Sequence, residues 1–477
     1  MWAVCKKELR QFFSSLTGYV AIIAFLSLNG LLLFVFPDTD ILTFGYATLD
    51  KFFELAPWIL LLLIPAITMR SLSDEFRMGT FEILQTLPLT RARLIAGKYV
   101  ASLTVVLIAL LPTLVYFLCI QRLSGQGGID TGATIGSYIG LVFLGAVFTA
   151  IGIWCSSFTP NAVVAFIVAA LTCCLLYSGF GAISTLPIFA AGADYYIGML
   201  GIDFHYRSIS RGVIDTRDVL YFLSVIFLFL FLTSRHLARR GQGPGARSPK
   251  AGAGVATVGA GVATAATRRA DGGGAAGRAG GGIIALILLV LIGLNFLAAL
   301  VHYRLDLTAD KRYTLSAPTK AMLARLDDDV QVDFFLEGNL KAGIRKLSKS
   351  SLEMLQNFNE YCGGKIRIHP FDPLANLDDS AKQTLLDSLG RMGIQPKTQV
   401  AQVKKGEEES ERIVIPAATI TYKGKSSPVD LLKGVQVATG EGQSEEQYYT
   451  NAETLLEYKF GSAIDKLTER KDRKSVV

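Results

Sequence analysis

Seven apolar runs of about membrane-spanning length dominate this sequence. Hydrophobic residues make up 51% of its 477 residues, and the mean hydropathy is +0.40. A helix needs about 20 apolar residues to cross the hydrocarbon core of a bilayer. These values argue against a soluble protein and predict an α-helical polytopic membrane protein. The predicted spans are residues 18–36, 55–69, 100–120, 135–154, 162–180 and 219–234, with a seventh at 283–301.

The distribution of lysine and arginine predicts how these spans are oriented. With the N-terminus in the cytoplasm, basic residues such as Arg70, Arg91 and Arg239 fall on the inner side, as the positive-inside rule requires. Six spans then return the chain to the cytoplasm near Arg240, and the seventh places residues 302–477 outside. We therefore expect a multi-pass protein of the inner (cytoplasmic) membrane with an extracytoplasmic C-terminal domain.

A glycine- and alanine-rich segment separates the sixth run from the seventh. Residues 241–282 contain few large apolar side chains, so they bury too little surface to fold by themselves. We expect a flexible cytoplasmic linker that joins two once-separate units. The expected domains are an interfacial helix at 1–16, a six-span domain at 17–240, the linker at 241–282, an anchor helix at 283–301 and an outer domain at 302–477.

The first 16 residues have the pattern of an amphipathic helix. Trp2, Leu9 and Phe12 share one predicted face, and Lys6 and Arg10 lie on the other. A helix with one apolar and one basic face is typical of the membrane surface. The alternative interpretation is a simple extension of the first span.

A highly charged stretch, residues 70–98, connects the second span to the third. Ser73 precedes two acidic residues, a pattern that predicts a helix start. Gly79 and Thr80 interrupt that helix, and a second short helix ends at Pro88. Apolar side chains in such a loop are available to a groove on a partner protein. A solvated connector with ordinary positive-inside charges is the alternative.

The sequence contains no phosphate-binding loop that would make the chain an ATPase. Such a loop needs the pattern G-x-x-x-x-G-K-[ST]. Lys98 is followed by Tyr99, and Thr419 stands where the first glycine before Gly424 should be. We expect no enzymatic activity here, so any ATP-driven motor would be a separate polypeptide. Six dispersed cysteines and four histidines also lack metal-ligand spacing, so we expect no metal or cofactor in this chain.

The C-terminal region alternates between strand and helix patterns, which predicts an α/β domain. Neither a nucleophile elbow nor a catalytic triad is present, so a binding or regulatory module is favoured over a hydrolase. The last residues, 473–477, resemble the start of another strand, so the domain looks truncated. The expected strands are residues 330–336, 365–371, 412–422 and 427–432, and the expected helices are residues 340–361, 380–392 and 451–467.

The charged loop resembles the E-x-x-x-G-T-x-E … P … G-K signature of ABC-2 type permeases. Glu75, the run Gly79 to Glu82, Pro88 and the pair Gly97-Lys98 carry this resemblance. It implies a subunit, most often of an exporter, that a separate ABC ATPase drives with ATP and Mg²⁺, and it implies two permease copies. The residues implied to couple the spans to the ATPase are Glu75, Gly79, Thr80, Phe81, Glu82, Leu84 and Pro88.

Two further stretches refine this resemblance. His205, Arg211, Gly212 and Asp215 belong to an outer-loop motif that is similar to the gliding-motility-type branch of these permeases. Residues 306–308, 311–316, 330–336 and 371–373 resemble the auxiliary, extracytoplasmic component of the same transporters. The resemblance therefore implies a permease fused to a shortened auxiliary component.

The sequence leaves one rival function open and does not identify a substrate. The rival is a membrane scaffold without transport activity, whose outer domain recruits cell-envelope partners. The net charge of +7 is explained by membrane topology, so we expect the lipid bilayer as a partner and no nucleic acid.

Overall fold

The computed structural model contains two compact units, which are described separately. The membrane unit comprises residues 1–40, 47–185 and 197–307, and the α/β unit comprises residues 41–46, 186–196 and 308–477. The residues that the structure describes are 1–36, 41, 47–86, 88, 90–124, 129–184, 186, 188, 193–240, 272–300, 303–309, 311–338, 340, 342–375, 378–391, 393–401, 410–435 and 445–468.

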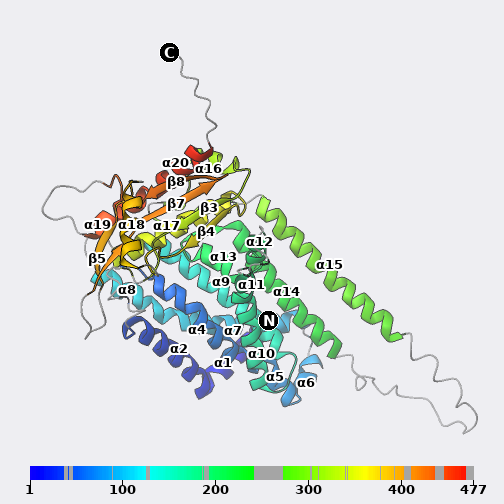
Figure 1. Cartoon of the computed structure of the whole chain (residues 1–477). Helices are drawn as coiled ribbons and strands as arrows, with labels where there is room; N and C mark the ends of the chain where they lie inside the picture. The colour runs from blue at the N-terminus through cyan, green and yellow to red at the C-terminus, as the bar shows by residue number, and fades with distance from the viewer. Residues whose placement is uncertain are drawn as a thin grey trace, which may run out of the picture. The chain divides into compact units, whose positions relative to one another are not determined.

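The membrane unit is built from long apolar helices (Figure 1). Among the described residues, five helical stretches are long and apolar enough to cross a bilayer, and six if the bent pair of α1 and α2 counts as one. This confirms the predicted polytopic fold. The helices are α2 (Leu16–Phe34), α4 (Asp50–Thr68), α7 (Arg91–Leu110) with α8 (Leu114–Leu123), α9 (Thr131–Ser156), α10 (Ala162–Cys174) with α11 (Phe180–Ser184), and α14 (Thr216–Arg240).

Helix α1 (Trp2–Ser14) precedes α2, and the chain bends by 72° between the two helices. Helix α1 packs so closely against α7 that position 97 has no room for a side chain. A side-chain carbon at Gly97 would lie 2.9 Å from Cβ of Val4. Cys5 is buried, whereas Trp2 is 72% exposed. The apolar face of α1 is therefore only partly used within the chain.

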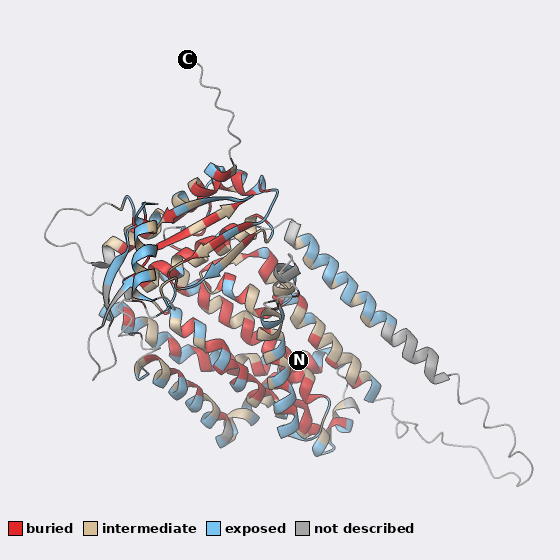
Figure 2. Cartoon of the chain, viewed as in Figure 1, coloured by how far each residue is buried: buried red, intermediate tan, exposed pale blue. Residues whose placement is uncertain are grey.

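The helices α4 and α9 form the buried centre of the membrane unit (Figure 2). Helix α9 carries Gly136, Gly140 and Gly145, and all three serve contacts within the chain. A side-chain carbon at Gly136 would lie 2.6 Å from Cα of Gly212, and one at Gly145 would lie 3.1 Å from Val106. Glycine at these positions therefore lets neighbouring backbones approach closely.

The seventh apolar helix begins earlier than the sequence predicts. Helix α15 covers Gly272–Leu300, so residues 272–282, expected to be linker, are helical. Glycine has a low helix propensity, but extending a helix that already exists adds one backbone hydrogen bond per residue. The rest of the expected linker, residues 241–271, lies outside the described residues.

The α/β unit contains a mixed four-stranded sheet with the order β4-β3-β7-β8. Strands β3 (Val330–Phe334) and β4 (Ile366–Pro370) are parallel, whereas β7 (Ala417–Tyr422) pairs antiparallel with both β3 and β8 (Lys425–Asp430). The unit also contains α16 (Ala317–Ala324), α17 (Ala342–Tyr361), α18 (Asp379–Arg391), α19 (Glu445–Thr454) and α20 (Leu456–Thr468).

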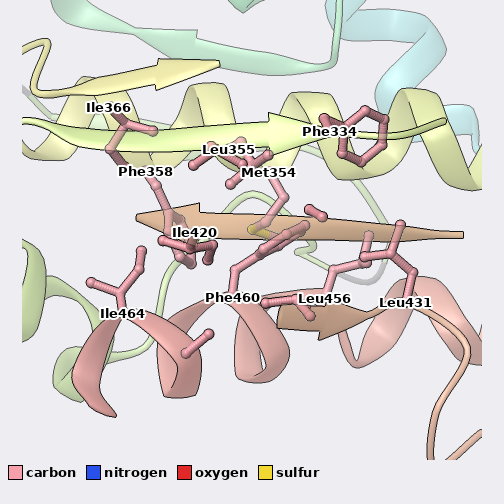
Figure 3. Close-up of a cluster of buried hydrophobic side chains, with 14 of the residues drawn as sticks. Phe334, Met354, Leu355, Phe358, Ile366, Ile420, Leu431, Leu456, Phe460 and Ile464 are labelled. Atoms are coloured by element: carbon pink, nitrogen blue, oxygen red, sulfur yellow. The ribbon is translucent and has the colours of Figure 1, made fainter. Parts of the chain in front are cut away.

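The core of this unit is apolar and continuous (Figure 3). Phe334 of the sheet, Phe358 of α17 and Phe460 of α20 are all fully buried in it. Alternate positions of β3 are buried, as the sequence pattern predicts for a strand with one face in the core. The helix-and-strand alternation therefore does form an α/β domain.

Two elements predicted for the α/β unit are each divided into two in the structure. The expected strand 412–422 is two strands, β6 (Ser410–Val414) and β7, because Pro416 lacks an N–H to continue a ladder. Strand β6 pairs with β5 (Lys397–Ala401), which the sequence did not predict. The expected helix 451–467 is likewise divided into α19 and α20. Residues 473–477 lie outside the described part of the chain.

Candidate functional site

The charged loop folds as two short helices that meet at a sharp turn. Helix α5 (Arg70–Arg77) follows α4 directly, so it begins three residues before the predicted start at Ser73. The Ser73 hydroxyl donates to the carbonyl oxygen of Met69 inside the helix and does not cap its end. Gly79 has a φ of +68°, a conformation that favours glycine, and it turns the chain into α6 (Thr80–Thr86).

The end of the loop is close to the prediction. Helix α6 ends before Pro88, which is exposed. Thr90 then caps α7, because its hydroxyl oxygen accepts a hydrogen bond from the Arg93 backbone N–H at 3.4 Å.

One side of the loop is packed against the membrane helices. Phe81 is only 8% exposed and belongs to a buried cluster with residues of α1, α7, α9 and α14. Its ring meets that of Phe76 edge-on, with centroids 4.9 Å apart. The guanidinium of Arg240 lies over the ring of Phe76, 4.5 Å from its centroid. These contacts fix the loop to the ends of several helices.

A buried ion cluster lies beside this apolar contact. The Lys98 side chain is 1% exposed, and its ammonium nitrogen lies 2.8 Å from Oε1 of Glu75 and 2.8 Å from Oε1 of Glu8. Lys98 also donates to the Ser71 carbonyl oxygen at 2.6 Å, and Lys7 reaches Glu75 at 3.3 Å. All three donors of the Lys98 ammonium therefore have acceptors, and two lysines balance two carboxylates.

This cluster joins three segments that are distant in sequence. Glu8 lies on α1, Glu75 on α5 and Lys98 on α7. A buried ion pair is costly to break, because removing one partner leaves an uncompensated charge. The cluster therefore links α1, the loop and α7 through buried charges.

The opposite side of the loop is exposed. Met78 and Ile83 are 57% and 65% exposed, and Glu82 is exposed beside them. We call Met78, Glu82 and Ile83 the loop tip. A cleft of about 300 Å³ lies between this tip, α5 and α1, and its walls carry both apolar and charged side chains. Such a mixed, exposed surface is suited to binding a protein partner.

The structure places the seven predicted coupling residues at buried, half-buried and exposed positions. Glu75 and Phe81 are buried and hold the loop in place, whereas Glu82 and Pro88 are exposed. Gly79 forms the turn between the helices. Thr80 and Leu84 are half-buried.

One predicted outer-loop residue, His205, belongs to a second charged cluster, at the N-terminal end of α14. His205, on α13 (Ile202–Ile209), lies 2.7 Å from Asp218 through Nδ1 and 2.9 Å from the Met199 carbonyl oxygen through Nε2. The two ring nitrogens of His205 therefore face one carboxylate oxygen and one carbonyl oxygen. The His205 ring stacks on Tyr221, and the Arg217 Nε lies 3.5 Å from Asp218.

The remaining residues of the outer-loop motif shape the backbone around this cluster. Gly212 has a φ of +86°, and a side-chain carbon there would lie 2.6 Å from Cα of Ala133. Asp215 is buried and accepts a hydrogen bond from the Arg217 backbone N–H at 2.8 Å. Arg211 is half-buried at the turn before Gly212. In the described parts of the chain, no three His, Cys, Asp or Glu side chains are grouped as metal ligands would be.

Comparison with known protein families agrees with the geometry of the membrane unit. Residues 2–198 match the model of the ABC-2 family transporter protein. The match supports an ABC-2 type permease. Permeases of this family are the non-catalytic membrane components of ABC transporters. Residues 309–421 match a domain of unknown function (DUF7088). No protein of curated function matches the chain significantly.

The sequence did not indicate the role of Glu8 and Lys98 in the membrane unit. Lys98 was noticed only as part of a motif, although it is followed by a long apolar run. A lysine at the start of a membrane helix needs a partner or access to water. That rule indicates a pairing but does not identify Glu8, which lies 90 residues away in sequence.

Proposed function

We propose that this chain is the permease subunit of an ABC transporter and that a separate ATPase binds the loop tip. The division of the loop into a buried side and an exposed side supports this proposal. The exposed side offers Met78, Glu82 and Ile83 to a partner, and the buried side connects that contact to the helices through Glu75 and Lys98. ATP and Mg²⁺ would be bound by the partner.

The proposed mechanism follows from the mechanical link within the loop. When the ATPase closes on ATP, it pushes on the tip, and the ion cluster passes this displacement to α1 and α7. The membrane helices then rock between inward-open and outward-open states. Since one copy has few helices with which to enclose a conduit, two permease copies with two ATPase chains form the working transporter. We propose export as its direction.

We further propose that the loop tip faces the cytoplasm at the inner membrane and that the α/β unit lies outside. The basic residues Arg235, Arg239 and Arg240 at the end of α14 support this orientation under the positive-inside rule. The motif around His205 supports the gliding-motility-type branch. The stretch Lys311–Ser316 supports a fused auxiliary component.

The test is co-purification of the permease with its ATPase, followed by an ATP hydrolysis assay. Glu82→Lys combined with Ile83→Arg should abolish the recovery of ATPase activity, because both changes place positive charge on the tip. Glu75 is unsuitable for this test, since Glu75→Lys would also disrupt the buried cluster. The matched control is Glu54→Lys, which changes an exposed glutamate at the other end of α4 and should retain the ATPase.

Two results would contradict the proposal. One is full ATPase recovery with the tip variant. The other is a native complex that contains envelope proteins but hydrolyses no ATP, which would favour the membrane scaffold.

A further inference from the structure

Two segments far apart in the sequence form a small sheet within the membrane unit. Strand β1 (Val213–Asp215), just before α14, pairs antiparallel with β2 (Arg304–Asp306), just after α15. The backbone N–H of Leu307 donates to Gly212 at 3.0 Å, and that of Thr216 donates to Tyr303 at 3.0 Å. The Tyr303 N–H also donates to the Thr216 hydroxyl oxygen at 2.9 Å. We call residues 212–216 and 303–307 the seam.

The first turns of α9 are shaped to receive this seam. A side-chain carbon at Gly132 would lie 1.8 Å from the Leu307 carbonyl oxygen, so no larger residue fits without moving the backbone. One turn further along, a side-chain carbon at Gly136 would lie 2.6 Å from Cα of Gly212. Each of the two paired segments therefore rests on a glycine of the same helix.

Helix α15 lies beside α14 and contacts the permease through one narrow stripe (Figures 1 and 2). Between Gly282 and Ala298, five positions are partly buried and all the others are exposed. The partly buried positions recur at intervals of three and four residues, which places them on one line along the helix. They are Ile284, Ile287, Leu291, Asn295 and Ala298.

The stripe contains one polar residue, and it has a partner on α14. The Asn295 side-chain amide donates to the hydroxyl oxygen of Ser224 at 3.0 Å, and Ser224 is buried. Interhelical hydrogen bonds of this kind help specify which helices associate in a bilayer, where apolar contact alone gives little preference. The stripe, the hydrogen bond and the seam therefore follow one continuous line along α14.

We propose that the seam and the stripe form a docking site by which each permease holds the anchor helix and following strand of its own chain, independently of residues 241–271. The occupant is the segment from Ile284 to Leu307. The contacts fix both its depth, through Asn295, and its register, through Val213 opposite Asp306. The covalent linker then raises the local concentration of the segment, but the contacts of the seam and the stripe keep the segment bound.

The first experiment cuts the linker of the folded, full-length protein. A protease site inserted after residue 255 is cleaved after purification in detergent, and the N-terminal piece is captured through an affinity tag. The C-terminal piece should remain bound. Gly132→Leu and Asn295→Ala should each lower the retained fraction several-fold. Gly293→Ala is the matched control, because a side-chain carbon at Gly293 meets nothing within 4 Å.

Complete loss of the C-terminal piece from the cleaved wild-type protein would overturn the proposal. Equal retention in the Gly132→Leu, Asn295→Ala and control variants would also overturn it, because the docking would then lie elsewhere.

The second experiment asks whether the docked segment belongs to the same chain. Val213 and Asp306 are directly opposite in the seam at a pair that does not exchange backbone hydrogen bonds, where Cα atoms are about 4.5 Å apart in antiparallel strands. The double variant Val213→Cys/Asp306→Cys should therefore form a disulfide on oxidation. The uncleaved protein should run as a single chain on a non-reducing gel, and the cleaved protein should stay joined.

The two single-cysteine variants control for the native cysteines. A disulfide-linked dimer formed only by the double variant would mean that the segment docks on a neighbouring copy, which contradicts the proposal. Failure of the pair to cross-link while the cleaved pieces stay bound would contradict the assigned register.

Discussion

Different interactions stabilise the interior of the membrane unit and the interior of the α/β unit. In the α/β unit, a continuous apolar core covers the sheet, with Phe334 and Phe460 fully buried. In the membrane unit, distant segments are joined by close glycine contacts and by a few buried polar groups, such as Lys98 with Glu75. The surroundings explain the difference. Burial of apolar surface is strongly favourable in water, but lipid is as apolar as the side chains, so it gives helices little reason to choose one neighbour over another.

The comparison predicts opposite sensitivities to mutation. Loss of a buried polar partner should damage the membrane unit most, whereas truncation of a buried apolar side chain should damage the α/β unit most.

The largest effect is expected at the ion cluster. Lys98→Met removes the central partner of the buried Glu75 and the half-buried Glu8, which should destabilise the membrane unit by about 4 kcal/mol. The measurement is the thermal unfolding midpoint of the purified protein in detergent.

Lys7→Met is the matched control for Lys98→Met. Lys7 is 54% exposed and contacts Glu75 at 3.3 Å, so its loss should cost about 1 kcal/mol or less. Equal unfolding midpoints for the two lysine variants would show that the ion cluster does not stabilise the membrane unit.

A somewhat smaller effect is expected in the apolar core. Phe460→Ala removes a fully buried ring from α20 and should cost the α/β unit about 3 kcal/mol. Alkylation of Cys362, which is buried in the same core, reports opening of this unit in the full-length protein when labelled peptides are quantified at increasing urea.

The membrane counterpart of Phe460→Ala is Leu289→Ala. Leu289 is 68% exposed on α15, so lipid replaces protein around it and its truncation should leave the thermal midpoint nearly unchanged. A large shift there would break the comparison.

The smallest effect concerns a carboxylate of the α/β unit and depends on pH. Partial burial of Glu457 opposes its ionisation, but hydrogen bonds from the Thr319 hydroxyl and the Ser316 N–H outweigh this, and the pKa of Glu457 lies below its ordinary value of 4.5. Because the folded-state pKa is lower than the unfolded one, this carboxylate contributes its full stability above pH 4.5 and loses it as the pH falls through the folded-state pKa.

Glu457→Gln should therefore destabilise the α/β unit by about 1 kcal/mol near pH 7, with a difference that shrinks in acid. Urea-dependent labelling of Cys362 with a dipyridyl disulfide, which also reacts with thiols in acid, measures this near pH 7 and in acid. Asp465→Asn, an exposed change on the same helix, should have no such pH dependence. A constant difference across pH would show that charge at Glu457 does not matter.

The same contrast explains how much of the fold could be predicted from the sequence. Apolar runs and strand alternation are local signals, and they correctly predicted the membrane helices, β3 and α17. The bend after Ser14 and the turn at Gly79 were also visible, because glycine and amphipathic patterns act locally. Ends of elements were less accurate, as the early start of α15 shows.

Contacts between distant segments were not predictable from local patterns. The pairing of Lys98 with Glu8 depends on how α1 lies against α7, and the pairing of β1 with β2 depends on how α14 and α15 associate. The tip residue Glu82 and the buried Glu75 belong to one sequence motif, yet only packing shows that they face opposite ways. The sequence therefore indicated the candidate site but not which of its residues are buried and which are exposed.

The most direct test of the central claim is photo-cross-linking in the purified complex of permease and ATPase. A photoreactive residue at position 83 should attach the ATPase chain, whereas one at position 54 should not. Cross-linking of the ATPase from position 54 alone, or from neither position while the ATPase stays bound, would contradict the proposal that the motor acts through the loop tip.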